Sequence, residues 1–357
     1  MKILVLNCGS SSLKFQLIDS ETEQVSASGN CERIGLDGKI TYKAHGDKFV
    51  TETDLPEHGI AIKKVLELLV DKERGVINSL DEIHAVGHRM VHGGEKFSSS
   101  VVITEDVIKD IESCNDLAPL HNPANILGVR ACQEAMPGVK HVAVFDTAFH
   151  QTMPAKAYLY GLPKEYYEKY GVRRYGFHGT SHSFVSKRLA ELAGLDYNNS
   201  KMIVCHIGSG ASISAIKDGK SIDTSMGMTP LEGLVMGTRS GDIDPAIIEF
   251  ICQKENISVS EMTTILNKKS GVLGLSGVSN DFRDLVDARE SGNKDAANAL
   301  DVLVYRIVKY IGAYYMALGG LDAIALTAGA GENNKEVREM IMEGISALGV
   351  KIDCAPA

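Results

Sequence analysis

The chain contains one strand–turn–strand pattern twice, with the copies about 200 residues apart. Lys2–Asp19 reads KILVLNCGSSSLKFQLID, and Lys201–Gly219 reads KMIVCHIGSGASISAIKDG. In each copy an apolar strand runs into a Gly/Ser turn and then into a second strand. The hydroxyls and backbone N–H groups of such turns can converge on phosphate oxygens. One copy alone could be an ordinary hairpin, but two copies favour a duplicated fold with a phosphate held between its halves.

Size and charge limit the class of protein. With 357 residues the chain is long enough for two domains. A net charge of −9 without a Lys/Arg run argues against a nucleic-acid partner or an anionic membrane. No apolar run has membrane-spanning length, and the first strand begins at Lys2, so we expect no signal peptide and no membrane partner. Any phosphate site must therefore carry its positive charge locally.

The cysteines indicate the compartment. None lies in a C-x-x-C pair, their number is odd, and several fall in apolar stretches. This pattern is typical of reduced core thiols rather than a disulfide framework or a zinc site. We therefore expect a cytoplasmic protein. The seven cysteines are Cys8, Cys31, Cys114, Cys132, Cys205, Cys252 and Cys354.

Strand and helix patterns alternate along the chain, which predicts an α/β architecture. A boundary near residue 150 gives two domains, 1–149 and 150–357. The expected strands are Lys2–Leu6, Leu13–Ile18, Gln24–Cys31, His84–Val91, Val139–Phe145 and a buried Asp322–Thr327. The expected helices include Ile60–Val70, Glu105–Ile111, Ala296–Leu318 before Gly319, and Lys335–Leu348.

Two further helix starts are predicted from capping residues. Thr180 or Ser181 could cap a helix that runs through Leu192. Asp244-Pro245 places a capping residue before proline at the first helical position. The apolar side of the first of these helices would carry Phe184, Val185, Leu189 and Leu192.

Four polar clusters could carry chemistry, and they suit phosphoryl transfer. That reaction needs positive groups around the moving phosphoryl, a metal on the nucleotide and accurate positioning. The planar fork of arginine matches phosphate and carboxylate oxygens, and Arg89 and Arg239 lie in polar or Gly-flanked loops. The clusters are Asn7 with Ser10 and Ser12, His88–Gly94, Phe177–His182 and Gly237–Asp244, joined by His121 and Asp146.

Each of these residues also has an ordinary structural explanation. A single arginine is often a surface ion pair, and a single histidine is often a hydrogen-bonded loop or core residue. Common nucleotide motifs are absent: Ser214 stands where a Walker A loop needs its first glycine, and no G-x-G-x-x-G follows a strand. Asp281-Phe282-Arg283 is not the protein-kinase DFG, because no HRD loop accompanies it.

Taken together, the motifs resemble those of the acetokinase family, within the acetate and sugar kinase/Hsp70/actin superfamily. The resemblance covers essentially the whole chain. It implies two duplicated ribonuclease H-like (actin-like ATPase) domains with an active-site cleft between them, the first on the carboxylate side and the second on the nucleotide side. The matching segments are NCGSSSLKF (Asn7–Phe15), HRMVHGG (His88–Gly94), PLHNPAN (Pro119–Asn125), FDTAFH (Phe145–His150), GFHGTSH (Gly176–His182), MTPLEG (Met228–Gly233) and GTRSGDIDP (Gly237–Pro245).

The resemblance implies reversible phosphoryl transfer between ATP and acetate, giving acetyl phosphate and ADP. The implied cofactor is Mg²⁺, with Mn²⁺ as an alternative, and the implied assembly is a homodimer. Arg89 would bind the carboxylate, and His178 and Arg239 would stabilise the moving phosphoryl. Asp146 would orient Arg89 or the substrate, or act on the Mg²⁺ shell. The remaining implied positions of this region are His121 near the phosphoryl, Asn7 at the metal, and Ser10 and Ser12 at the phosphates.

The resemblance also implies a nucleotide site and a small acid pocket. A valine at position 91 predicts a preference for acetate, although one extra methylene changes discrimination by only about 1–3 kcal/mol. Propionate or butyrate kinase activity stays open as an alternative. The pocket residues would be Val91, Leu120, Phe177 and Pro230. The nucleotide residues would be Lys14, His206, Gly208, Ser209, Gly210, Asp281, Phe282, Arg283, Gly329, Ala330, Gly331, Glu332 and Asn333.

The chain departs from the family pattern in two places. Ser209 stands where the family usually has asparagine, so we expect a modest effect on nucleotide affinity. The family also continues beyond Ala357 with a glutamate that helps to organise Mg²⁺ and a helix that packs on the first domain. Without that segment we expect weaker metal binding and exposed apolar surface. A non-catalytic nucleotide-binding protein therefore remains a second alternative.

Overall fold

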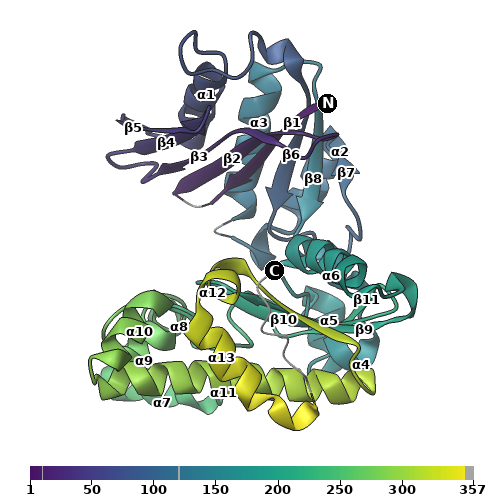
Figure 1. The fold of residues 1–357 in the computed structure, drawn as a ribbon, viewed down its shortest axis with the longest axis vertical. Coiled ribbons are helices and arrows are strands. Elements are labelled where there is room, and N and C mark those ends of the chain that lie inside the picture. The colour runs from purple at the N-terminus through teal and green to yellow at the C-terminus, as the bar shows by residue number, and fades with distance from the viewer. Residues whose placement is uncertain (10, 120, 350–357) are drawn as a thin grey trace. The chain divides into compact units, whose positions relative to one another are not determined.

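The computed structural model describes residues 1–9, 11–119 and 121–349 and divides the chain into two compact units. The first unit is Met1–Ala148, and the second begins at Phe149. Each unit is built around its own β-sheet (Figure 1). Among the described residues, no helix combines the length and the apolar character that a membrane crossing requires.

The first unit contains an eight-stranded mixed sheet. Strand β1 is antiparallel to β2 and parallel to β6, and β6 is parallel to β8. Leu13, Phe15 and Leu17 of β2 are buried, whereas Lys14 and Gln16 between them are exposed. This period-two alternation is typical of a sheet with one covered face. In spatial order the strands are β5 (Asp47–Glu52), β4 (Lys39–Ala44), β3 (Val25–Glu32), β2 (Ser12–Asp19), β1 (Lys2–Cys8), β6 (Ile83–Met90), β8 (Lys140–Phe145) and β7 (Val101–Val102).

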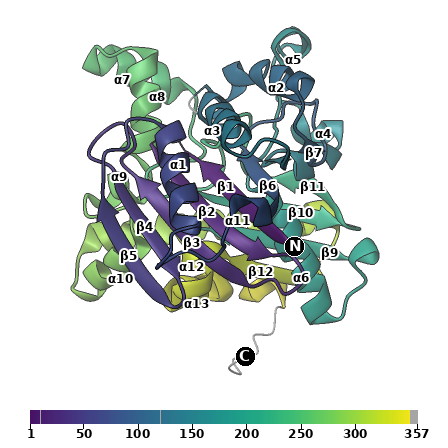
Figure 2. The ribbon, with the colours of Figure 1, turned by 90° about the horizontal axis from the view of Figure 1, so that it is seen from above.

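Helices α1 (His58–Leu69) and α3 (Asn122–Ala135) cover this face of the first sheet (Figures 1 and 2). Both contact the central strands, and they also contact each other. Ile62 and Leu69 of α1 are almost fully buried in the core that the helices form with the sheet. Helix α2 (Glu105–Glu112) packs on α3, and short 3₁₀ turns occur at Leu80–Glu82 and Asn115–Leu117.

The second unit repeats the topology of the first. Its sheet has the order β11 (Lys220–Thr224), β10 (Ala211–Lys217), β9 (Lys201–Ile207) and β12 (Ala323–Thr327). Strand β9 is antiparallel to β10 and parallel to β12, as β1 is antiparallel to β2 and parallel to β6. The β10–β11 hairpin turns at Asp218 and Gly219, whose positive φ angles of 51° and 75° suit a tight two-residue turn. The predicted duplication is therefore confirmed.

Helices α6 (Gly179–Ala193) and α11 (Lys294–Leu318) contact the second sheet from opposite faces (Figure 1). Six of the seven residues of β10 are consequently buried, as expected of a strand covered on both sides. The predicted end of α11 is correct, because Gly319 follows it with φ 66°. The other helices are α4 (Ala155–Tyr158), α5 (Lys164–Tyr170), α7 (Ala246–Glu255), α8 (Val259–Lys268), α9 (Gly271–Ser276), α10 (Phe282–Glu290), α12 (Ala328–Asn333) and α13 (Lys335–Gly344), with 3₁₀ turns at Ala148–Thr152, Tyr197–Asn199 and Ser346–Leu348.

The predicted cap of α6 is wrong. The residue at the N-cap is His178, with φ 57°, and no side chain caps the helix. Thr180 and Ser181 lie inside the helix, and the Ser181 hydroxyl instead contacts His206 Nδ1 at 2.8 Å. Local capping rules failed here because the first turn of α6 is part of a histidine cluster.

The predicted apolar side of α6 is only partly correct, because Val185 and Leu189 pack against the core of the second unit whereas the other two predicted residues do not. Phe184 and Leu192 are 67% and 74% exposed. The buried side carries the small or polar residues His182, Ser186 and Ala190. The most buried face of a helix that packs on a sheet beside a polar cluster is therefore not always its most apolar one.

Smaller differences occur elsewhere in the second unit. Strand β12 is half-buried rather than buried, since it forms the edge of the sheet. Residues Ala328–Asn333, between a predicted strand and a predicted helix, form a short helix that was not predicted. At the start of α7 the N-cap is Pro245 and not Asp244 as predicted, although Asp244 Oδ1 still accepts from Ala246 N at 2.9 Å. Five of the six described cysteines are buried, in agreement with core thiols, and Cys354 lies outside the described residues.

Candidate active site

In the first unit, three polar side chains meet at the carboxyl ends of parallel strands. Asn7 lies near the end of β1, Arg89 near the end of β6, and Asp146 directly follows β8. The carboxyl ends of parallel strands share one edge of a sheet, where α/β proteins place their ligands. The two neighbours of the arginine are thus brought to it by topology, although they are far from it in sequence.

Asp146 holds Arg89 in a bidentate ion pair. Arg89 Nε donates to Asp146 Oδ1 at 2.9 Å, and its second terminal nitrogen lies 2.5 Å from Oδ2. The other terminal nitrogen donates to Asn7 Oδ1 at 3.1 Å. The Asp146 side chain is 4% exposed and that of Arg89 is 38% exposed. The carboxylate raises the pKa of the guanidinium, so Arg89 is a fixed cation that still reaches solvent.

Two buried asparagines of α3 anchor the loops around this arginine. Asn125 Oδ1 accepts from Val91 N at 3.1 Å, and its Nδ2 donates to the Cys8 carbonyl at 2.7 Å. Asn122 binds the backbone of His92 in the same way, through N at 3.2 Å and O at 3.0 Å. The ends of β1 and β6 are therefore tied to the same helix, and His121 lies at its N-cap.

The first Gly/Ser turn is closed by backbone contacts. Gly9 N donates to Ser12 O at 2.7 Å, and the Gly9 carbonyl contacts His58 Nε2 at 2.7 Å. A Cβ at position 9 would lie 2.8 Å from Ser12 Oγ, which explains the glycine. Ser10 and Leu120, two predicted site residues, lie outside the described residues.

In the second unit, His178 lies in a cluster of imidazole rings and hydroxyls. Its ring stacks on His206 with centroids 4.2 Å apart. Its Nδ1 is 2.8 Å from Ser212 Oγ, and the same Oγ is 2.7 Å from His182 Nε2. Ser212 is fully buried on β10, opposite His206 in the strand register. Sequence analysis missed Ser212, and its only signal was its place after the second Gly/Ser turn.

Arg239 lies on a loop that reaches the second Gly/Ser turn. One terminal nitrogen donates to the Pro230 carbonyl at 2.9 Å. A Cβ built at Gly210 would be 3.0 Å from the other, so the guanidinium lies against this turn. The loop itself is held by Gly237 N, which donates to Ser209 O at 3.0 Å.

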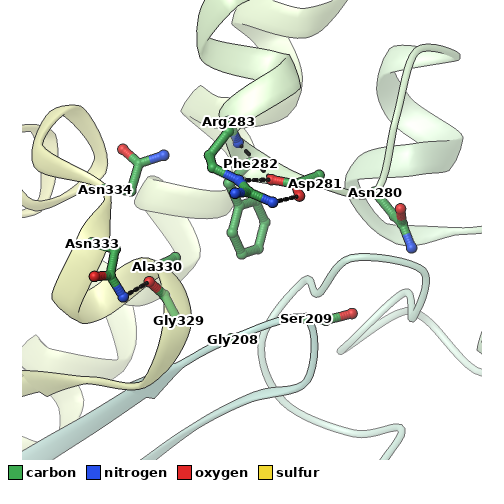
Figure 3. A pocket seen from close by; sticks show the side chains of 10 residues that line it. All are labelled: Gly208, Ser209, Asn280, Asp281, Phe282, Arg283, Gly329, Ala330, Asn333 and Asn334. Carbon is green, nitrogen blue, oxygen red and sulfur yellow. Dashed lines mark hydrogen bonds and ion pairs between the residues drawn. The ribbon is translucent and has the colours of Figure 1, made fainter. Parts of the chain in front are cut away.

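A cavity of about 610 Å³ lies beside the same turn of the second unit (Figure 3). Its walls come from the Gly208–Ser209 turn, the start of α10 and helix α12. Arg283 makes a bidentate pair with Asp281, with contacts of 3.0 and 2.6 Å, and this pair lowers the pKa of Asp281 to about 2. The lining residues are Gly208, Ser209, Asn280, Asp281, Phe282, Arg283, Gly329, Ala330, Asn333 and Asn334.

Eight of the thirteen predicted nucleotide residues line this cavity. The five that do not are Lys14, His206, Gly210, Gly331 and Glu332. Lys14 belongs to the first unit, where it lines a separate hollow of about 420 Å³. Glu332 is directed to the start of α12, where Oε1 accepts from Thr327 Oγ1 and Ala328 N at 2.8 and 2.9 Å. Asn280 and Asn334 line the cavity but were not predicted, since neither belongs to a recognisable motif.

Within the described residues, no group of three His, Cys, Asp or Glu side chains could hold a metal ion. The predicted metal residue, Asn7, presents an oxygen that already accepts from Arg89. Mg²⁺ usually keeps several waters and binds one or two protein oxygens together with substrate phosphates. A metal of this kind would need only one or two protein oxygens, such as Asn7 Oδ1.

The Acetokinase family model matches residues 2–356. Among curated proteins, the chain is 64% identical over 354 residues to an acetate kinase of Lachnoclostridium phytofermentans, covering 99% of this chain and 90% of the relative. It is 65% identical to an acetate kinase of Agathobacter rectalis, covering 99% and 89%.

Solved structures agree with these relatives. The acetate kinase of Porphyromonas gingivalis matches with a TM-score of 0.95 at 51% identity, covering 99% of this chain and 89% of that one. A propionate kinase of Francisella tularensis matches with a TM-score of 0.93 at 44% identity, covering 99% and 90%. These matches define the class of the protein, a phosphotransferase whose two units repeat one strand arrangement. The chain belongs to the acetokinase family.

Proposed function

We propose that this chain is an acetate kinase that catalyses reversible phosphoryl transfer between ATP and acetate. An acetate oxygen attacks the γ-phosphorus of ATP, the bond from that phosphorus to the β-γ bridging oxygen breaks, and acetyl phosphate and ADP are the products. Acetate is already ionised at neutral pH, so the attack needs no strong general base. The main barrier is repulsion between two anions, which fixed cations can offset.

Arg89 is the observation that carries this proposal. Its guanidinium is charged, held by Asp146 and Asn7, and still 38% exposed. Such a group can bind a carboxylate without first losing conformational freedom. From the family resemblance we propose Val91 as an apolar contact for a small acyl group. We propose Leu120, Phe177, Pro230 and His121 as further members of the acyl and phosphoryl sites.

We assign the phosphoryl group to His178 and Arg239. Arg239 lies against the second Gly/Ser turn, and His178 is fixed by its contacts with Ser212 and His206. The turn Gly208–Gly210 would hold the nucleotide phosphates, and the 610 Å³ cavity would take the adenosine. Ser12 of the first turn would donate to phosphate oxygens.

We propose Mg²⁺, or Mn²⁺ in its place, as the cofactor, bound with ATP and contacted by Asn7. When bound, the metal would neutralise charge on the phosphates. The residues described above bind and orient the substrates around it. We also propose, from the family resemblance, a cytoplasmic homodimer, which light scattering of the purified chain would test.

The substrate is tested by an acid series. We expect kcat/KM to fall from acetate to propionate to butyrate, because each added methylene must fit against Val91 and its neighbours. Propionate kinase is the second candidate, since a solved relative at 44% identity bears that name. A higher kcat/KM with propionate than with acetate would reject the acetate assignment.

A further inference from the structure

One buried hydroxyl joins two histidines of the second unit. Ser212 Oγ lies 2.8 Å from His178 Nδ1 and 2.7 Å from His182 Nε2. Both histidines belong to the first turns of α6, and Ser212 comes from β10. A serine hydroxyl has one hydrogen and two acceptor lone pairs, and among the described residues the two imidazole nitrogens are the only partners of Ser212 Oγ. The buried hydrogen is therefore satisfied only when Ser212 donates it to one ring and accepts from the other. The protons on the two histidines are therefore linked.

His182 determines which of the two rings donates to Ser212 Oγ and which accepts from it. Its side chain is fully buried, and its Nδ1 has no hydrogen-bond partner among the described residues. Burial, together with the neighbouring histidines, lowers the pKa of His182 far below its usual value, so the ring is neutral. A buried N–H without an acceptor is costlier than an under-used acceptor nitrogen. The single proton of His182 therefore belongs on Nε2, where it donates to Ser212 Oγ.

We propose that Ser212 is a positioning residue that holds neutral His178 with its proton on Nε2. Because Ser212 accepts from His182, its own hydrogen is directed to His178 Nδ1. That nitrogen must then be unprotonated, and the ring proton of His178 lies on Nε2. The reverse arrangement would put the proton of His182 on its buried, unpartnered Nδ1.

This inference rests on the proposed function, in which His178 faces the moving phosphoryl. The tautomer determines whether His178 Nε2 acts as a hydrogen-bond donor or as a nucleophile. With the proton on Nε2, that nitrogen donates a hydrogen bond and is no nucleophile. His178 then stabilises negative charge on the phosphoryl oxygens without taking up the group. The stacked His206 ring, 4.2 Å away and held by Ser181, keeps the imidazole plane in place.

The test combines two readouts on the full chain carrying ¹⁵N-labelled histidine. In the wild type, two-bond ¹H–¹⁵N correlations should show His178 protonated on Nε2, with His178→Gln assigning the signal. In Ser212→Ala, we expect protonation on Nδ1 to appear. We also expect kcat to fall about 10- to 100-fold with KM for ATP unchanged, as is usual when a group that orients a working histidine is lost. Ser212→Cys, which keeps a weak donor and acceptor, should restore part of kcat.

Ser214→Ala is the matched control. Ser214 lies two residues along the same strand, is equally buried, and donates to Thr224 Oγ1 at 3.0 Å instead of contacting a histidine. It should leave both the His178 spectrum and kcat unchanged. An unchanged His178 tautomer in Ser212→Ala, or an equal loss of kcat in Ser214→Ala, would overturn the inference. If the tautomer shifts as expected but the wild type makes no acetyl phosphate, the positioning role stands and the proposed function fails.

Discussion

Arg89, which we assign to the acetate carboxylate, is fixed by its partners before a substrate arrives. The bidentate contact with Asp146 and the contact with Asn7 together use all three guanidinium nitrogens. A lysine could keep the charge but not this fork. The geometry of the guanidinium, and not only its charge, should therefore matter for binding acetate.

We expect Arg89→Lys to lower kcat/KM for acetate about 10- to 100-fold, mainly through KM, because a single ammonium cannot contact Asp146, Asn7 and a carboxylate together. KM for ATP should stay within about twofold. Steady-state kinetics with each substrate varied in turn measure both values. An unchanged KM for acetate would remove Arg89 from the acid site.

Arg239→Ala should lower kcat about 10²- to 10³-fold, the loss typical of removing one fixed donor from a developing charge. ATP binding, measured by calorimetry, should remain, because Arg239 lies beside the turn but is not one of the residues that line the cavity. Arg239→Lys is the matched variant and should recover part of kcat. Loss of ATP binding together with an unaffected kcat would assign Arg239 to the nucleotide instead.

Motif reading could find Arg89, Asp146, His178 and Arg239, because their residue types in Gly-flanked loops already suggest a site. It could not find Ser212 or Asn280. Ser212 reaches the histidine cluster because strand pairing places it opposite His206. Asn280 lines the cavity because its loop lies beside Asp281. Such contacts depend on packing, which a single sequence does not display.

Among the elements, α3 organises the first unit by binding two strand ends. We expect Asn125→Leu to lower the free energy of unfolding by about 2–4 kcal/mol, since it leaves the buried Val91 N and Cys8 O without partners. Urea unfolding measures this loss. Asn125→Asp keeps the acceptor for Val91 N. Its kcat/KM for acetate should therefore lie between the values of the wild type and Asn125→Leu. Stability within about 0.5 kcal/mol of wild type in Asn125→Leu would contradict this role.

Strands β6 and β8 contain a buried histidine pair that should make stability depend on pH. His88 Nε2 lies 2.9 Å from His141 Nδ1, and burial, aided by His141, lowers the pKa of His88 to about 3. Below about pH 6.5 the unfolded chain takes up a proton that folded His88 does not, so stability falls as the pH drops from about 6.5 toward 3. The loss approaches about 1.4 kcal/mol per pH unit.

Urea midpoints at several pH values test this dependence. His88→Gln should flatten the slope, whereas His84→Gln, at an exposed position of the same strand, should not. Equal slopes in all three proteins would show that other groups control the acid response.

Element types were largely predictable, and the reason is periodicity. The alternation in β2 and the apolar spacing of α1 are strong local signals, and both elements occur where expected. Helix α6 shows the limit, because its buried side of His182, Ser186 and Ala190 is set by the histidine cluster and by close packing on the sheet. A local pattern cannot reveal a face that long-range contacts define.

The whole chain is two copies of one topology that have taken on different chemistry. We assign the Arg89 cation of the first copy to a carboxylate, and the 610 Å³ cavity of the second copy to a nucleotide. Since we assign the metal to the nucleotide, removing Mg²⁺ with a chelator should abolish acetyl phosphate formation. ATP should still bind, more weakly, in calorimetry. Activity that survives complete chelation would contradict a metal role.

The most direct test is to incubate this chain with acetate and MgATP and to trap acetyl phosphate as the hydroxamate, with Arg239→Ala as the blank. We predict acetate-dependent trapping together with an equal amount of ADP, and little of either from the variant. ATP binding without any trapped product would contradict the proposal and would favour a non-catalytic nucleotide-binding protein.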